Sequence, residues 1–205
     1  MLSDESFDML VDLLLLGLSE CHRSNDPRSG RLIMNMVQTF YREGEDDEHE
    51  YMQVHVRNHD IWKDIRFWEG VFFDALQVEK ERQGKSAHQW RELGDEEREE
   101  RIVNDQHVVF GQLGSYAFNM LAFGMDVEES KNFVEKMCSI NELPQEYHEM
   151  ILANIEMTLE KLYPEDSEER QKLKKEEWRR AEKKVKEILP FFNPVQRMSQ
   201  HISPS

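Results

Sequence analysis

The sequence predicts an all-α protein, a single helical bundle of six to eight helices with a central apolar helix near residues 105–125 and a charged C-terminal helix. Apolar residues recur at helical spacing in most segments. The stretch 108–125 is apolar on nearly every side of a helix, which is typical of a helix packed in the middle of a bundle. The 205 residues are enough to bury such a core.

The first two helices are expected at 3–23, capped by Ser3 or Asp4, and at 31–42. The short linker between them predicts an antiparallel hairpin. Leu10, Leu13, Leu14 and Leu18 supply apolar positions on the first helix, and Leu32, Met36, Val37 and Phe40 are expected to face inward from the second. Residues 43–50 are predicted as an acidic loop. Residues 51–58 fit a short strand or a helix, and we favour a helix because no partner strand is evident.

Further helices are predicted at 61–82, capped by Asp60, and from Asp95 through the apolar stretch, with a kink or restart near Gly111 or Gly114. Gly124 fits a helix C-terminus and Asp126 an N-cap for the next helix. A last core helix is expected from Pro144 to Tyr163. The predicted structural core includes Trp68, Phe72, Phe73, Leu113, Leu121 and Phe123. Three polar residues on apolar helices, Arg66, Asp74 and Asn119, are candidates for buried polar contacts that fix helix register.

Pro164 divides the chain into a predicted helical core domain, 1–163, and a charged helical arm with a flexible tail, 164–205. Within the arm, basic residues lie among apolar ones and form a candidate partner-binding segment: Trp178, Arg179, Arg180, Lys183 and Lys184. Glutamates alternate with these residues. A solvated, self-paired helix, or one that folds back on the acidic body, is therefore the alternative.

The net charge of −16 is concentrated in residues 1–164, which hold 34 acidic and 16 basic side chains. Such a surface repels nucleic-acid phosphates and anionic lipids and favours a basic protein partner, although the acidity also serves solubility alone. No integral membrane segment is expected, because 108–125 is short and contains Gln112, Ser115 and Asn119. Two distant cysteines and an acidic N-terminus without a signal-peptide pattern predict a cytoplasmic protein.

The sequence motifs predict no catalytic residues, cofactor or metal. Gly84-Lys85-Ser86 ends like a phosphate-binding loop, but Glu79 occupies the position of the required first glycine. His55 and His59 are four residues apart and leave a metal site open as an alternative. Cys21 and His22 are adjacent on a helix and therefore point in different directions, which does not suit a nucleophile and its base.

Several segments resemble the Set-binding-factor-type domain of DENN-containing myotubularin-related pseudophosphatases and of a related small neuronal protein. The residues that carry this resemblance are Glu20-Cys21-His22, Leu32 to Met36, Thr39-Phe40-Tyr41, Arg66-Phe67-Trp68, Phe72 to Ala75, Phe110 to Gly114 and Asn119 to Gly124. The resemblance covers about residues 7–160. A weaker likeness to the C-terminal region of MADD-type Rab exchange factors lies in Trp68-Glu69, Phe73 to Ala75, Glu97-Arg98 and Asp105.

The resemblance implies a non-enzymatic adaptor or scaffold domain in membrane trafficking or cytoskeletal regulation, with a protein partner. The alternative is a regulatory module of a Rab guanine-nucleotide exchange factor that contacts a small GTPase. A metal-dependent enzyme using His55 and His59 is the third hypothesis. Because the matching residues are largely core residues, they predict the fold better than the activity. The oligomeric state is left open.

Overall fold

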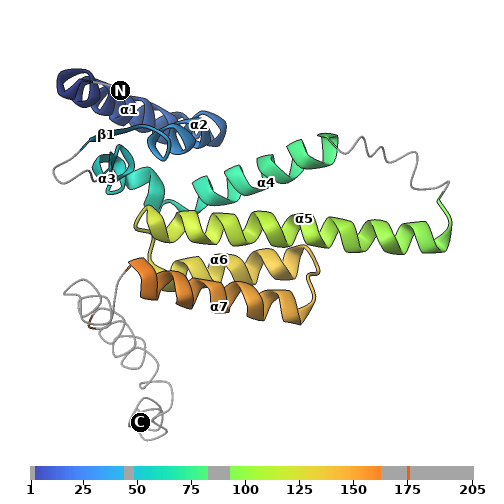
Figure 1. Cartoon of the computed structure of the whole chain (residues 1–205). Coiled ribbons are helices and arrows are strands. Elements are labelled where there is room, and N and C mark those ends of the chain that lie inside the picture. The colour runs from blue at the N-terminus through green and yellow to red at the C-terminus, as the bar shows by residue number, and fades with distance from the viewer. Residues whose placement is uncertain (1–2, 44–48, 83–92, 163–174, 176–205) are drawn as a thin grey trace, which may run out of the picture. The chain divides into compact units, whose positions relative to one another are not determined.

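The computed structural model describes residues 3–43, 49–82, 93–162 and 175 (Figure 1). In chain order the elements are α1 (Asp4–Ser24), α2 (Pro27–Val37), β1 (Tyr41–Glu43), β2 (His49–Tyr51), α3 (Gln53–Val56), the 3-10 turn η2 (Asp60–Lys63), α4 (Ile65–Arg82), α5 (Asp95–Ala122), α6 (Val127–Ile140) and α7 (Gln145–Leu162). Seven α-helices in the described ranges confirm the predicted all-α class. None of these helices is long and apolar enough to cross a membrane.

The chain divides into two compact units, 1–158 and 159–205. Of the second unit only residues 159–162 and 175 are described, so the predicted charged helix lies outside the described residues. The domain boundary at 163/164 stays a prediction.

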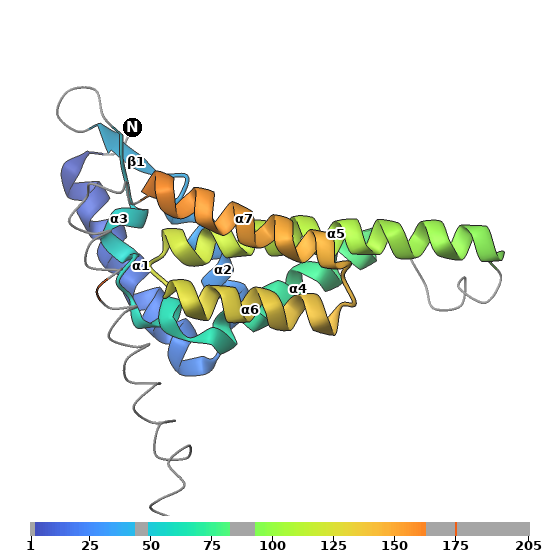
Figure 2. The same cartoon turned by 90° about the horizontal axis from the view of Figure 1, so that it is seen from below.

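The first unit is built from helices packed in sequence order. The α1–α2 hairpin packs on α4 through α2, α4 packs on α5, and α5 on α6. Tyr147 of α7 lies against Phe110 of α5, with ring centroids 4.9 Å apart, and an ion pair joins Lys131 of α6 to Glu156 of α7. Figure 2 shows α6 and α7 running along α5.

Local capping sets the ends of the first two helices. The Ser3 side chain accepts a hydrogen bond from the Ser6 amide and caps α1, as predicted. Asp26 accepts from the Ser29 amide, 3.1 Å away, and Pro27 occupies the first turn of α2. The second helix therefore spans Pro27–Val37 and not the predicted 31–42.

A two-stranded ribbon lies before the predicted helix at 51–58 and includes its first residue, Tyr51. Tyr41 pairs with Tyr51 and Glu43 with His49 in an antiparallel register. Only Gln53–Val56, a single turn, is helical in that region. The first strand was not predicted, because Tyr41 and Arg42 were assigned to the end of the second helix.

A tryptophan pair anchors the segment that leads into α4. His59, and not the predicted Asp60, caps η2: its Nδ1 accepts from the Ile61 amide. The fully buried Trp62 donates its Nε1–H to the Val56 carbonyl, and the fully buried Trp68 donates to the Trp62 carbonyl, each at 2.8 Å. Both indole N–H groups are thus satisfied inside the core.

The long helix α5 runs without a break from Asp95 to Ala122, so neither Gly111 nor Gly114 restarts it. Its buried side includes Leu113 and Leu121, whereas Phe118 is exposed and a Cβ at Gly111 would meet open space. One side of this helix is therefore open, which differs from the burial on every side that its composition suggested. As predicted, Gly124 adopts a positive φ of 78° after the helix, and Asp126 caps α6.

Candidate protein-interaction site

Five large apolar side chains of α1 and α2 are exposed to solvent: Met9 (59%), Leu13 (58%), Leu16 (68%), Leu32 (62%) and Met36 (37%). We name these five residues the hairpin face. Single exposed apolar side chains are common on protein surfaces, but neighbouring ones mark interaction sites. All five belong to one helical hairpin, whose two helices lie side by side in Figure 1.

Helix geometry places these residues on one surface. On α1 the buried residues follow one stripe, Phe7, Val11, Leu14, Leu18 and Cys21. Met9, Leu13 and Leu16 are spaced by four and three residues and therefore form a second stripe, on nearly the opposite side of the helix. Gly17 and Ile33 mark the contact between the two helices, because a Cβ at Gly17 would lie 3.0 Å from Ile33 Cδ1. The exposed stripes of α1 and α2 adjoin across this contact.

The structure corrects the predicted inner side of the second helix. Gly30, Met34 and Val37 are buried, whereas Leu32, Met36 and Phe40 are exposed. Gly30 packs against Phe67 of α4, and Met34 lies one turn further on the same side, so Leu32 and Met36 lie on the opposite side of the helix. One feature of the sequence indicated this exposed surface: each helix carries more apolar residues than one buried stripe needs.

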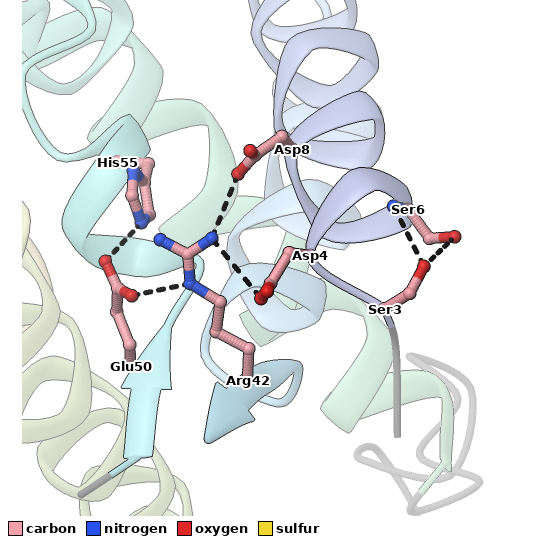
Figure 3. A network of polar contacts seen from close by, with 7 residues as sticks. All are labelled: Ser3, Asp4, Ser6, Asp8, Arg42, Glu50 and His55. Carbon is pink, nitrogen blue, oxygen red and sulfur yellow. Dashed lines mark hydrogen bonds and ion pairs between the residues drawn. The ribbon is translucent and has the colours of Figure 1, made fainter. Parts of the chain in front are cut away.

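The Arg42 guanidinium holds the N-terminal half of α1 to the β-ribbon (Figure 3). It contacts Glu50 at 2.6 Å, Asp8 at 3.2 Å and Asp4 at 3.8 Å, and it lies 4.8 Å from the centroid of the buried Phe7 ring. The Arg42 hydrogen bond lowers the pKa of the Glu50 carboxyl. These contacts fix the start of the helix that carries half of the hairpin face.

Glu50 also reaches α3, because its other oxygen contacts His55 Nε2 at 2.8 Å. His55 in turn stacks edge-on against Phe7, with ring centroids 5.5 Å apart. One carboxylate therefore joins the ribbon, α1 and the single turn of α3.

A second polar cluster joins the other end of α1 to η2. Ser19 Oγ and His59 Nε2 are 3.0 Å apart, and the same serine hydroxyl donates to the Leu15 carbonyl. His22, one turn further along α1, lies 3.5 Å from Asp64, whose carboxyl also accepts from Arg66. The Arg66 hydrogen bond lowers the pKa of Asp64.

The hydrogen bonds of His59 decide what the Ser19–His59 pair can do chemically. Since Nδ1 accepts from the Ile61 amide, the proton of the neutral ring is on Nε2, and this N–H donates to Ser19 Oγ. A general base needs a free lone pair on the nitrogen that faces the nucleophile. The arrangement therefore holds two elements together and does not activate the serine.

The pKa of His59 is lowered from its ordinary 6.5, first by burial and then by His22 and Lys63, with Asp60 acting in the opposite direction. Below pH 6.5 the unfolded chain binds a proton that the folded protein resists, so the free energy of unfolding falls as the pH falls. We expect the melting temperature to drop less between about pH 7.5 and 5.5 in His59→Asn, whose amide oxygen can still cap η2.

The original protein, melted at the same pH values, is the reference. An equal pH dependence in His59→Asn and the original protein would contradict the role given to His59.

The three predicted buried polar residues have different surroundings. Asp74 is almost fully buried and contacts Arg28 Nε at 2.5 Å and Arg31 at 3.2 Å, which joins α4 to α2. Asn119 accepts a hydrogen bond from the Gln38 amide at 2.8 Å and is half-buried. Arg66 is exposed and binds only the nearby Asp64 among the contacts of the described residues, so its prediction as a buried residue is wrong.

Five of the six predicted core residues, Trp68, Phe72, Leu113, Leu121 and Phe123, lie in the interior. Phe73 is 42% exposed, so its assignment to the core is wrong. It follows Phe72 directly in α4, and adjacent helix residues point about 100° apart. The predicted partner-binding arm, Trp178, Arg179, Arg180, Lys183 and Lys184, lies outside the described residues.

His55 and His59 do not converge as a metal site would require, because His55 faces Glu50 and His59 faces Ser19. In the described ranges no three histidine, cysteine or acidic side chains gather as potential ligands. Both cysteines are buried, and burial raises the pKa of each thiol, that of Cys138 to about 11. Such thiols are poor nucleophiles.

Comparison with known proteins relates this geometry to a family. The SBF2 family model, described as a myotubularin protein, matches residues 1–87. Because of this similarity we refer to residues 1–87 as the SBF2-type segment. This confirms the predicted Set-binding-factor-type resemblance over that range, whereas its extension to residue 160 and the MADD-type likeness stay predictions. The SBF2-type segment contains all of the hairpin face and both polar clusters.

Two relatives share part of the chain. Uncharacterized protein KIAA0513 from Homo sapiens is 29% identical over 117 residues, which is 52% of this chain and 28% of that protein. Serine/threonine-protein kinase pakD from Dictyostelium discoideum is 31% identical over 77 residues, 37% of this chain and 5% of the kinase. The chain thus spans less than a third of either relative. No solved structure matches the chain.

Proposed function

We propose that this chain is a non-enzymatic protein-interaction module that acts as an adaptor or scaffold. The hairpin face carries the proposal, because five exposed apolar side chains on one rigid hairpin are typical of a surface that another protein covers. The face lies inside the SBF2-type segment. Helix α1 is held by the Arg42 and Ser19–His59 contacts, and α2 by the ion pairs of Arg28 and Arg31 with Asp74, which would keep the surface preformed for binding.

The setting that we propose is membrane trafficking or cytoskeletal regulation in the cytoplasm. It is supported by the resemblance to a domain of DENN-containing myotubularin-related proteins. The same resemblance favours a second candidate, a regulatory module of a Rab exchange factor that contacts a small GTPase.

Affinity capture with the full chain tests both candidates. We would compare the proteins that the immobilised chain retains from cytosol with those retained by the double variant Leu13→Asp, Leu16→Asp. Purified Rab GTPases would be applied in parallel with GDP, with a GTP analogue and without nucleotide. An adaptor should retain non-GTPase proteins whatever the nucleotide, and lose them in the variant.

Selective retention of one Rab in a single nucleotide state would support the exchange-factor candidate instead. An identical set of proteins on the original chain and the folded variant would contradict the hairpin face as the site. Stoichiometric zinc or iron in the purified protein would revive the metal-dependent enzyme.

A further inference from the structure

We propose that the hairpin face receives an amphipathic helix of a partner protein whose apolar stripe is flanked by lysine and arginine. This inference rests on the proposed function and adds the chemistry of the partner. The size of the face, the arrangement of its side chains and its charged border each support this partner.

The dimensions of the face fit a helix. Met9 and Leu16 are seven residues apart on α1, which corresponds to about 10 Å along the helix axis. Two turns of a partner helix cover that length and present apolar residues at positions i, i+3 or i+4, and i+7. The close Gly17–Ile33 contact brings the exposed side chains of α1 and α2 near one another, so that one partner helix can contact both.

The border of the face is acidic on the α1 side. Glu5 and Asp12 are exposed and lie next to the Leu16 stripe on the helix surface, within 40° of it around the helix axis by the ordinary ~100° step per residue. Glu20 continues the stripe one turn beyond Leu16, near the end of α1, and pairs with Arg23. Residues 1–164 as a whole carry 34 acidic against 16 basic side chains. Basic residues beside the partner's apolar stripe would be attracted here and acidic ones repelled.

The same charges argue against two other occupants. An anionic membrane surface would meet Glu5 and Asp12 before Leu16 could insert. A second copy would bring two acidic borders together, and five residues are few beside the roughly 20–30 that each partner contributes to a stable interface. Neither objection applies to a basic amphipathic helix.

The test uses the full chain and three synthetic 18-residue peptides, with binding followed by fluorescence anisotropy. The first peptide is a leucine–lysine amphipathic helix, the second has glutamate in place of lysine, and the third has the composition of the first in an order without a helical stripe. We expect the first to bind at least ten times more tightly than the other two. Its affinity should fall at least ten-fold in the double variant Leu13→Asp, Leu16→Asp.

Phe118→Asp is the matched control, because it places an acidic residue at another exposed apolar position, on α5, and should leave binding unchanged. Circular dichroism checks that every variant stays folded. Equal binding of the lysine and glutamate peptides would overturn the basic partner, and equal binding of the ordered and scrambled lysine peptides would overturn the helical one.

Unchanged peptide binding in the folded double variant would overturn the proposal. A dimer in sedimentation that this variant abolishes would also overturn it, because the face would then bind a second copy. Binding to phosphatidylserine vesicles that this variant loses would overturn it as well, because the face would then bind a membrane. If the peptides fail to bind while cytosolic partners are still lost in the variant, the partner chemistry is wrong and the adaptor function stands.

Discussion

Replacing Trp68 with alanine is expected to destabilise the first unit by about 3–5 kcal/mol. The side chain is fully buried, lies 5.3 Å from the Phe67 ring and 6.1 Å from the Trp62 ring between centroids, and donates its N–H to the Trp62 carbonyl. Alanine removes these contacts and leaves a cavity between η2 and α4. Since domains are stable by roughly 5–15 kcal/mol, this loss is a large part of the total.

Chemical denaturation followed by circular dichroism measures the effect of Trp68→Ala, since tryptophan fluorescence would change with the substitution itself. The adjacent Phe73→Ala is the matched control: this aromatic residue is 42% exposed, and its loss should cost about 1 kcal/mol or less. Similar losses in the two variants would contradict the burial assigned to Trp68.

Gly30→Ala is expected to destabilise the protein by about 1–3 kcal/mol, although alanine is the better helix former. A Cβ at this position would lie 2.6 Å from Cε2 of Phe67 and 3.4 Å from Ile61 Cδ1. The Phe67 ring is buried and packed edge-on against Trp62 and Trp68, so it cannot move aside without disturbing both. Substitution should therefore separate α2 from α4.

Gly111→Ala should have the opposite effect. This glycine is exposed in the middle of α5, and a Cβ there meets nothing within 4 Å. Alanine restricts the unfolded chain and should stabilise the protein by about 0.4–1 kcal/mol. The two substitutions make the same chemical change, so thermal melting of the pair isolates the close α2–α4 approach. A stabilised Gly30→Ala protein would contradict that approach.

Features set by neighbouring residues were predictable from the sequence. Ser3, Gly124 and Asp126 occupy the helix ends expected of them, because capping depends on side chains and backbone within a few residues. The buried aromatic residues of α4 and the core leucines of α5 followed from their helical spacing.

Features that depend on distant residues were missed. The β1–β2 ribbon pairs residues on either side of an acidic stretch, and strands of three residues give too short a pattern to detect. His59 replaced Asp60 as the cap of η2, where its Nε2 also reaches Ser19 on α1. Asp74 pairs with Arg28 and Arg31 of another helix, and the sequence offered many arginines as partners.

The hairpin face illustrates the difference between features that local sequence determines and features that depend on distant residues. The sequence by itself determined that this region forms two amphipathic helices joined by a short linker, because periodicity is local, although it placed the second at 31–42 and not at Pro27–Val37. Only the tertiary structure decided which apolar residues are buried: the close contact of Gly30 with Phe67 turns Met34 inward and leaves Leu32 and Met36 exposed. Both helices carry more apolar residues than the interior accepts, and packing against α4 and η2 selects which of them remain available to a partner.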